Sequence, residues 1–240
     1  MSAQVVTKDE LDTLPPAMPW QALVVMLLAV AFGAFAAAVI LPNWLPGLSA
    51  SLLGAEPKAY WYLSRASAMI AFLLLWFSMA SGLIITNKLA RVWPGGPTAF
   101  DLHQYTSLLG LAIGLFHALI LMGDHYINFS LAQVLIPFTS TAYRPIWVGI
   151  GQLGLYASAI VSFSFYVRKR LGRRAWRLIH YLSFINFMLT LIHGITSGTD
   201  SPEAWARGLY WATGLSLVFL TVYRIIVSVF EPKKQPKLAK

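Results

Sequence analysis

The sequence predicts an all-α integral membrane protein built as a bundle of six transmembrane helices. Six separate apolar segments are long enough to cross a hydrocarbon core about 30 Å thick. Only 11% of the residues are charged and 58% are hydrophobic, whereas soluble domains carry about 25% charged residues. The chain therefore has too few charges to cover a surface that faces water, which excludes an ordinary soluble protein.

The apolar segments divide the chain into one membrane domain and two short tails. Residues 1–19 are polar and contain three prolines, so we expect a cytosolic tail. A signal peptide is not indicated, because the first apolar run begins too far along the chain and no charged region directly precedes it. Residues 20–230 form the predicted six-helix domain and residues 231–240 a basic cytosolic tail. The predicted spans are 20–41, 59–86, 99–122, 147–167, 175–196 and 205–230.

Two connections between the spans have some apolar character. Residues 42–57 are expected to form a loop with an apolar turn. Residues 123–145 form the longest connection and are half apolar. We expect this second segment to lie on the outer surface as an interfacial helix or a lid.

The basic residues predict the orientation of the bundle. Six of them fall in residues 168–177, directly before the fifth span, whereas the loops on the opposite side contain only Lys58, Arg144 and Arg207. Cytoplasmic loops are the ones enriched in Lys and Arg, so both termini are predicted to be cytoplasmic, in a plasma or inner membrane. The net charge of +9 does not indicate nucleic-acid binding, because the cations lie beside apolar spans, where they contact lipid head groups.

Four of the five histidines lie within two spans. His103 and His117 are on the third span, and His180 and His193 are on the fifth. Their separations of 14 and 13 residues correspond to about 21 and 19.5 Å along a helix. Both spans run from inside to outside, so His103 and His180 share an inner level and His117 and His193 share an outer level.

Two neutral imidazoles at one level, from two helices, suit the axial positions of a six-coordinate haem b. Zinc or copper would need three or four ligands at one level, and the chain has no cysteine. One feature does not fit simply. At 100° per residue, the third-span histidines lie about 40° apart and the fifth-span histidines about 140° apart. The fifth span must bend, change its winding or present its ligands on different flanks.

Other interpretations of the histidines stay open. They could be core residues that hydrogen-bond between helices, or a proton relay in a transporter or channel. A structural or assembly subunit without a cofactor is a third possibility. His125 falls in the outer connection, where we expect it to be exposed to solvent.

The sequence resembles the ferric reductase-like transmembrane superfamily. The resemblance covers roughly residues 59–230 and includes the two histidine pairs, the stretch RLGRRAWRLIH before and into the fifth span, IHG at its end and LSRA in the second span. That superfamily includes NADPH oxidases, yeast-type ferric reductases and the haem subunit of the periplasmic methionine sulfoxide reductase system. The resemblance implies two stacked b-type haems, with His103 and His180 as inner ligands and His117 and His193 as outer ligands.

The resemblance also implies an oxidoreductase that moves electrons across the membrane. The flavin and nicotinamide domains of larger members are absent from the sequence, so the expected donor is a separate flavoprotein or a membrane quinol. Ferric iron or a redox partner protein is the expected acceptor on the outer face. Leu121 stands where some oxygen-reducing relatives have a further histidine, which argues against superoxide production. A haem subunit for methionine sulfoxide reduction is an alternative, although such relatives often lack a counterpart of His103.

Several further residues are candidates for supporting roles. Arg65, about two turns into the second span, is expected near the outer haem, where it would bind a propionate or attract an anionic acceptor; a snorkelling arginine is the alternative. Gly110 and Gly114 would allow close approach of a porphyrin or of another helix. Phe187 is expected between the two levels, as a core aromatic. The remaining candidates are Arg91, Arg173, Arg174 and Arg177 for inner propionates or donor docking, and Thr199 and Asp200 for the outer acceptor site.

Overall fold

The computed structural model describes residues 15–47, 58–124, 127–141 and 143–230. It is 84% helical, no strand occurs in these residues, and six helices are long and apolar enough to cross a membrane. The predicted all-α, six-span architecture is confirmed. The elements are α2 (Trp20–Phe35), η1 (Ala36–Ile40), α3 (Leu41–Trp44), α5 (Lys58–Thr86), η2 (Leu89–Arg91), α6 (Gly96–Ile120), η3 (Leu121–Gly123), α7 (Leu131–Leu135), α8 (Pro145–Tyr166), α9 (Arg168–Ser197) and α10 (Ala204–Phe230).

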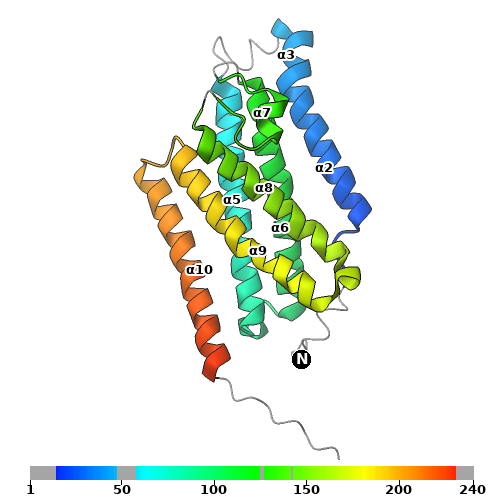
Figure 1. Cartoon of the computed structure of the whole chain (residues 1–240), viewed down its shortest axis with the longest axis vertical. Coiled ribbons are helices and arrows are strands. Elements are labelled where there is room, and N and C mark those ends of the chain that lie inside the picture. The colour runs from blue at the N-terminus through cyan, green and yellow to red at the C-terminus, as the bar shows by residue number, and fades with distance from the viewer. Residues whose placement is uncertain (1–14, 48–57, 125–126, 142, 231–240) are drawn as a thin grey trace, which may run out of the picture.

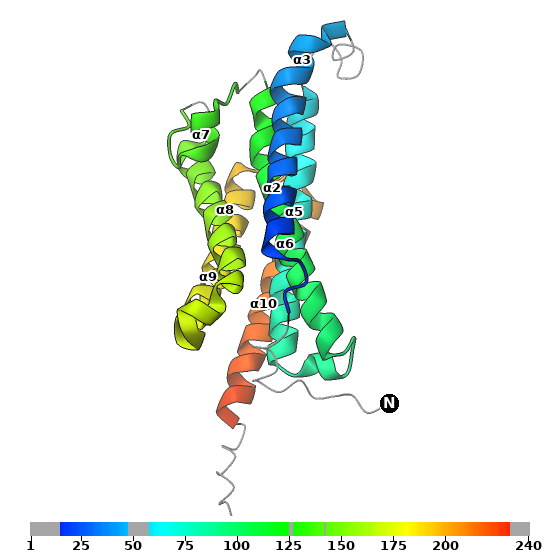
Figure 2. The same ribbon diagram turned by 90° about the vertical axis from the view of Figure 1, so that its right-hand side faces the viewer.

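The long helices form two layers. Figure 2 shows α2, α5 and α6 side by side in one layer and the hairpin of α8 and α9 in the other. Within each layer, the antiparallel neighbours α5 and α6, and α8 and α9, contact each other along their lengths. Contacts of α5 with α9 and of α6 with α8 join the layers. Helix α10 packs against α5 at one edge of the bundle (Figure 1).

Large apolar side chains cover the outside of the bundle. Phe32 on α2 is 70% exposed and Phe219 on α10 is 68% exposed. A soluble monomer rarely exposes extended apolar patches of this kind, and hydrocarbon is the medium that removes their cost. The backbone polar groups of these segments are satisfied within the helices, as a lipid environment requires. The exposed surface is thus consistent with a protein that spans a lipid bilayer several times.

The first span is longer than predicted. The expected loop from residue 42 begins too early, because α3 continues the helix through Pro42 to Trp44. A proline in a helix lacks the backbone N–H and clashes with the carbonyl four residues earlier. The π-helical turn η1 directly precedes α3, and the wider winding of a π turn accommodates Pro42. Residues 48–57 of the expected loop lie outside the described part.

The last residues of the predicted N-terminal tail link the two layers. The backbone N–H of Ala17 donates to Oε1 of Gln104 at 3.1 Å, and the hydroxyl of Tyr105 donates to the carbonyl of Ala17. On the other layer, the hydroxyl of Tyr166 donates to the carbonyl of Met18 at 2.9 Å. The segment before α2 therefore ties α6 to α8 near the His103 end of the bundle.

The predicted interfacial segment contains the short helix α7. A capping box between Ser130 and Gln133 begins this helix, and Nε2 of Gln152 on α8 donates to the carbonyls of Gln133 and Val134, each at 2.7 Å. The hydroxyl of Tyr143 donates to the carbonyl of Ser197 at 2.7 Å. These bonds hold the segment over the end of the bundle that carries α7 in Figure 1. His125 and residues 231–240 lie outside the described part.

Candidate functional site: two histidine pairs

The four histidines of the spans meet in two pairs, each joining α6 to α9. The ring centres of His103 and His180 are 6.0 Å apart, with an angle of 74° between the ring planes. The ring centres of His117 and His193 are 6.2 Å apart, with an angle of 68°. These are the two levels that the sequence predicts, and the distances between the partners are nearly equal. We refer to them as the His103 pair and the His117 pair.

Backbone carbonyls determine which nitrogen carries the proton in three of the four rings. Nδ1 of His103 lies 2.8 Å from the carbonyl oxygen of Ser78, and Nδ1 of His117 lies 2.8 Å from that of Ser64. Nδ1 of His193 lies 2.8 Å from the carbonyl oxygen of Trp147. A carbonyl only accepts, so Nδ1 must donate, and the lone pair of the neutral ring is then on Nε2. Each ring is therefore in the tautomer that a metal ligand needs.

His180 is held differently from the other three. Its ring stacks on the indole of Trp176, one turn earlier on α9, with ring centres 5.3 Å apart and an angle of 28°. Among the described residues its ring has no hydrogen-bond partner. The His103 pair thus has one ring braced by a carbonyl and one braced by an aromatic side chain.

Helix α9 accommodates the 13-residue spacing of His180 and His193 by presenting the two rings on different flanks. Gly172, with φ 75° and ψ 159°, is the residue of this helix with non-helical torsion angles. It lies before His180, so the backbone keeps α-helical winding from His180 to His193. The two rings therefore leave α9 on flanks about 140° apart, and the crossing of α9 over α6 brings both within reach of α6.

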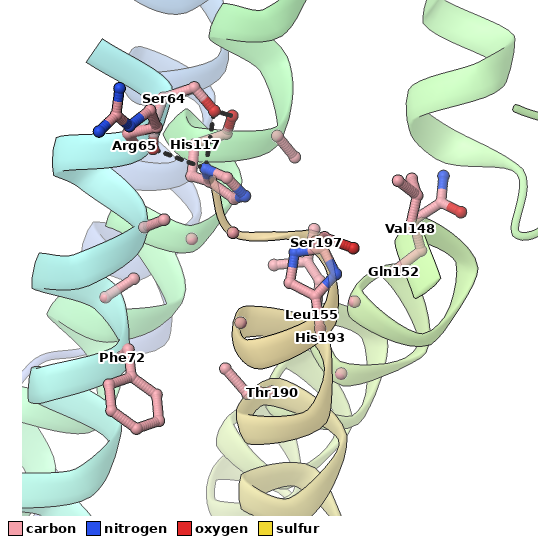
Figure 3. A pocket seen from close by; sticks show the side chains of 18 of the residues that line it. Ser64, Arg65, Phe72, His117, Val148, Gln152, Leu155, Thr190, His193 and Ser197 are labelled. Atoms are coloured by element: carbon pink, nitrogen blue, oxygen red, sulfur yellow. Dashed lines mark hydrogen bonds between the residues drawn. The ribbon is translucent and has the colours of Figure 1, made fainter. Parts of the chain in front are cut away.

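A cavity separates the two layers around the His117 pair. Its volume is about 210 Å³, measured as the space that the centre of a water molecule can reach. One water needs about 10–15 Å³ on this measure, and packed interiors contain few voids larger than one water. The space is thus far too large for a packing defect. Figure 3 shows the rings of His117 and His193 approaching from opposite walls.

The cavity is mostly apolar and runs along the helices. On α5 its lining extends from Trp61 to Leu75, a rise of about 21 Å. On α6 it reaches from Ala118 to Ser107, one turn from His103, and Leu121 of η3 also lines it. Phe129, Val134 and Tyr143 of the α7 segment also line it, so this segment covers one end of the cavity.

Two glycines give the rings room. A Cβ atom on Gly151 of α8 would lie 2.5 Å from Nδ1 of His193, and one on Gly82 of α5 would lie 3.3 Å from Cε1 of His103. The first distance is impossible without a shift, whereas the second needs a displacement of a few tenths of an ångström. Gly151 is therefore required for the present position of His193.

Arg65 lies at the cavity and has a partner within the protein. Its Nε donates to Oδ2 of Asp200 at 2.9 Å, and its Nη2 forms a second, short bond to Oδ1. Both residues line the cavity, and their side chains are 32% and 17% exposed. The bidentate pair joins α5 to the connection between α9 and α10, so a haem propionate or an anionic acceptor would meet a guanidinium that Asp200 already neutralises.

The ring distances can be tested against the groups that two imidazoles could hold. A bound metal lies about 3 Å from an imidazole centre, because the metal–nitrogen bond is about 2 Å long and the nitrogen is about 1 Å from the centre. Two ligands on opposite sides of one metal then have centres about 6 Å apart. Both pairs meet this distance. No cluster of three His, Asp or Glu side chains occurs in the described residues, so a haem iron fits these pairs better than zinc does.

Buried polar atoms without a protein partner lie beside both pairs. Oε1 of Gln152 and Oγ of Ser197 belong to residues that line the cavity of the His117 pair. Nε1 of Trp176 belongs to the indole that stacks on His180, and Nε2 of Gln104 belongs to the residue that follows His103 in the chain. Such atoms are costly unless they find a partner. The groups of Trp176, Gln104 and Ser197 can donate to a carboxylate, whereas Oε1 of Gln152 needs a donor.

Other residues singled out in the sequence lie at or away from the cavity. Gly110, Gly114, Leu121 and Thr199 line it. Phe187 is 2% exposed and stacks on Phe72, with ring centres 5.8 Å apart. The four arginines suggested for propionates or donor docking are exposed and do not belong to the cavity lining: Arg91, Arg173, Arg174 and Arg177.

Five residues that brace or make room for the histidines were not among the candidates predicted from the sequence. These are Ser64, Ser78, Trp147, Gly151 and Trp176. The carbonyl contacts leave no signature in side-chain type, so the sequence could not reveal them. A signal did exist for the serines, because Ser64 and Ser78 repeat the 14-residue separation of His103 and His117.

Comparisons with known proteins do not identify the chain. No protein-family model, no curated protein and no solved structure matches it.

Proposed function

We propose that this protein is a membrane cytochrome b that moves electrons across the bilayer, with one haem b at each histidine pair. The observation that carries the proposal is the matched ring separation of 6.0 and 6.2 Å at two levels of the same two helices. On this proposal the axial ligands are His103 with His180 and His117 with His193. When bound, haem supplies one-electron redox chemistry at its iron.

The surroundings of the histidines support this role by holding the rings in place and by being mostly apolar. The carbonyls of Ser64, Ser78 and Trp147 hold the proton of three rings on Nδ1, which leaves the lone pair on Nε2 for a metal. Two histidines at one haem iron would leave no position for a substrate, so the chemistry that the haem would supply is outer-sphere electron transfer. The mostly apolar cavity walls would give a bound haem surroundings of low dielectric constant.

The wider proposal follows the resemblance to the ferric reductase-like superfamily, of which we propose this chain to be a member. Both termini would be cytoplasmic, with the His103 pair near the cytoplasm. Electrons would arrive from a separate flavoprotein or a quinol and leave, near the His117 pair, to ferric iron or a redox partner protein. The chain would act as the haem subunit of an oxidoreductase.

The visible spectrum of the purified full chain, before and after dithionite, tests the proposal. We expect a Soret band and an α-band that sharpen on reduction, with two haems per chain. His193→Ala should remove one haem and His180→Ala the other, whereas His125→Ala, in a predicted loop, should remove neither.

Three outcomes would contradict the proposal in different ways. A wild-type protein without these bands would refute haem binding. A subunit without a cofactor, or a proton relay through the histidines, would then be favoured. Two haems retained in both His193→Ala and His180→Ala would refute the ligand assignment. Loss of a haem in His125→Ala would show that the fifth histidine is a ligand.

A further inference from the structure

Two serines on α5 bracket the two histidines of α6 in the same way. Oγ of Ser64 lies 2.9 Å from Nδ1 of His117, and its backbone carbonyl lies 2.8 Å from the same nitrogen. Oγ of Ser78 lies 3.2 Å from Nδ1 of His103, and its carbonyl lies 2.8 Å away. Each ring nitrogen thus faces two oxygens of a single serine.

The repeat follows from the antiparallel packing of α5 and α6. The serines are 14 residues apart on α5 and the histidines are 14 residues apart on α6. Because the two helices run in opposite directions, Ser64 meets the later histidine and Ser78 the earlier one. Both serines are buried, at 3% and 4% exposure, and their small side chains let the helices approach closely enough for a carbonyl to reach a ring.

The hydroxyl protons are directed away from the rings. Oγ of Ser64 donates to the carbonyl of His117 at 3.2 Å. At the other level, Oγ of Ser78 lies 2.5 Å from Oγ of Ser107, which donates to the carbonyl of His103 at 2.7 Å. A hydroxyl that donates its proton to another acceptor presents a lone pair to Nδ1–H. Each serine therefore offers the ring two acceptors, the carbonyl and the hydroxyl.

The histidines of α9 lack this arrangement. Nδ1 of His193 faces the carbonyl of Trp147 and, among the described residues, no side-chain acceptor. His180 has the stacked indole of Trp176. The doubled acceptors are thus a property of the α5–α6 hairpin. They occur once at each level, so each level can be perturbed separately.

We propose that Ser64 and Ser78 are positioning residues, each of which orients one axial histidine and makes it electron-rich. This inference rests on the proposed function. A ligand whose second nitrogen donates a strong hydrogen bond is more basic, and a more basic ligand stabilises the oxidised iron. Ser64 thereby lowers the reduction potential at the His117 pair, and Ser78 lowers it at the His103 pair.

The variants Ser64→Ala and Ser78→Ala, made in the full chain and titrated electrochemically in the visible region, test this inference. Each should raise the potential of one haem and leave the other unchanged, and the two variants should affect different haems. Haem affinity at the affected level should fall by about tenfold. The backbone carbonyl stays in both variants, so partial rather than complete loss is expected.

Conservative and control variants separate positioning from folding. Ser64→Thr and Ser78→Thr keep the hydroxyl. They should restore the wild-type reduction potentials and the wild-type electron paramagnetic resonance spectrum of the low-spin ferric haems. Ser164→Ala removes a buried serine whose hydroxyl donates within α8, to Val161, and should change neither potential.

The inference is overturned if both potentials stay at their wild-type values in both alanine variants, or if either variant shifts both haems equally. A failed threonine rescue would also overturn it, because bulk rather than the hydroxyl would then control the potential. Wild-type protein with two haems but insensitive serines would refute this inference alone. Wild-type protein without haem would refute the proposed function itself.

Discussion

The two histidine pairs have nearly the same ring separation and quite different surroundings. At the His117 pair, carbonyls brace both rings, a large cavity surrounds them, and an ion pair lies on its wall. At the His103 pair, a carbonyl braces one ring and Trp176 stacks on the other. The spacing of the ligands is thus set by the helices, whereas the electronic environment of each level is set by local neighbours. Variants that touch one level and spare the other can break or sharpen this comparison.

The largest effect is expected from Gly151→Ala. The new Cβ would overlap the ring of His193 at 2.5 Å from Nδ1, so the ring must leave its carbonyl and its position. We expect haem at the His117 pair to be lost, with affinity at least about tenfold lower, while the other haem stays. Absorbance per chain measures this.

Gly82→Ala is the matched variant at the other level. Its Cβ would lie 3.3 Å from His103, a distance that a small displacement relieves. Haem content should therefore stay close to wild type. Equal loss in both variants would show that the two levels do not differ in their room for the rings.

A smaller effect is expected from the ion pair. Asp200→Asn leaves Arg65 as an uncompensated cation on the cavity wall, which should raise the reduction potential at the His117 pair. Arg65→Gln leaves the carboxylate of Asp200 and should lower it. Because both side chains retain exposure to solvent, the shifts should be modest and should shrink as salt increases.

Redox titration of the two variants gives the signs. Asp101→Asn, an exposed carboxylate on α6 near the opposite end, is the control and should shift neither potential at moderate salt. Shifts of the same sign in Asp200→Asn and Arg65→Gln would contradict an electrostatic role for the pair.

The smallest effect is expected from Trp176→Leu. The substitution removes the indole that stacks on His180 and keeps an apolar side chain. Because the ring of His180 can then reorient, the electron paramagnetic resonance spectrum of the low-spin haem at the His103 pair should change. Both haems should be retained. Trp211→Leu, at a position 68% exposed on α10, should leave the spectrum unchanged. An altered signal from the other haem would mean that Trp176 acts on the whole bundle.

Some features followed from the sequence because they depend on composition and spacing along the chain. The six spans, the two levels of histidine and the position of Arg65 near one level all follow from a fixed rise per residue. Such reasoning fails at Pro42. The usual effect of proline predicts that the first helix ends there, but the π-helical turn η1 precedes it and the helix continues to Trp44. The partner of Arg65 also needed the fold, since Asp200 is 135 residues away in the chain.

The sequence by itself determined that this is a multi-span helical membrane protein with four histidines at two depths, because hydrophobicity and helical rise are local properties. Only the tertiary structure decided how those histidines are held. His180 and His193 leave α9 about 140° apart, yet both meet a histidine of α6. The oblique course of α9 relative to α6 (Figure 1) makes this possible, and the periodicity of one helix does not reveal it. The carbonyls of Ser64, Ser78 and Trp147 act through backbone atoms that every residue has, so only packing could select them.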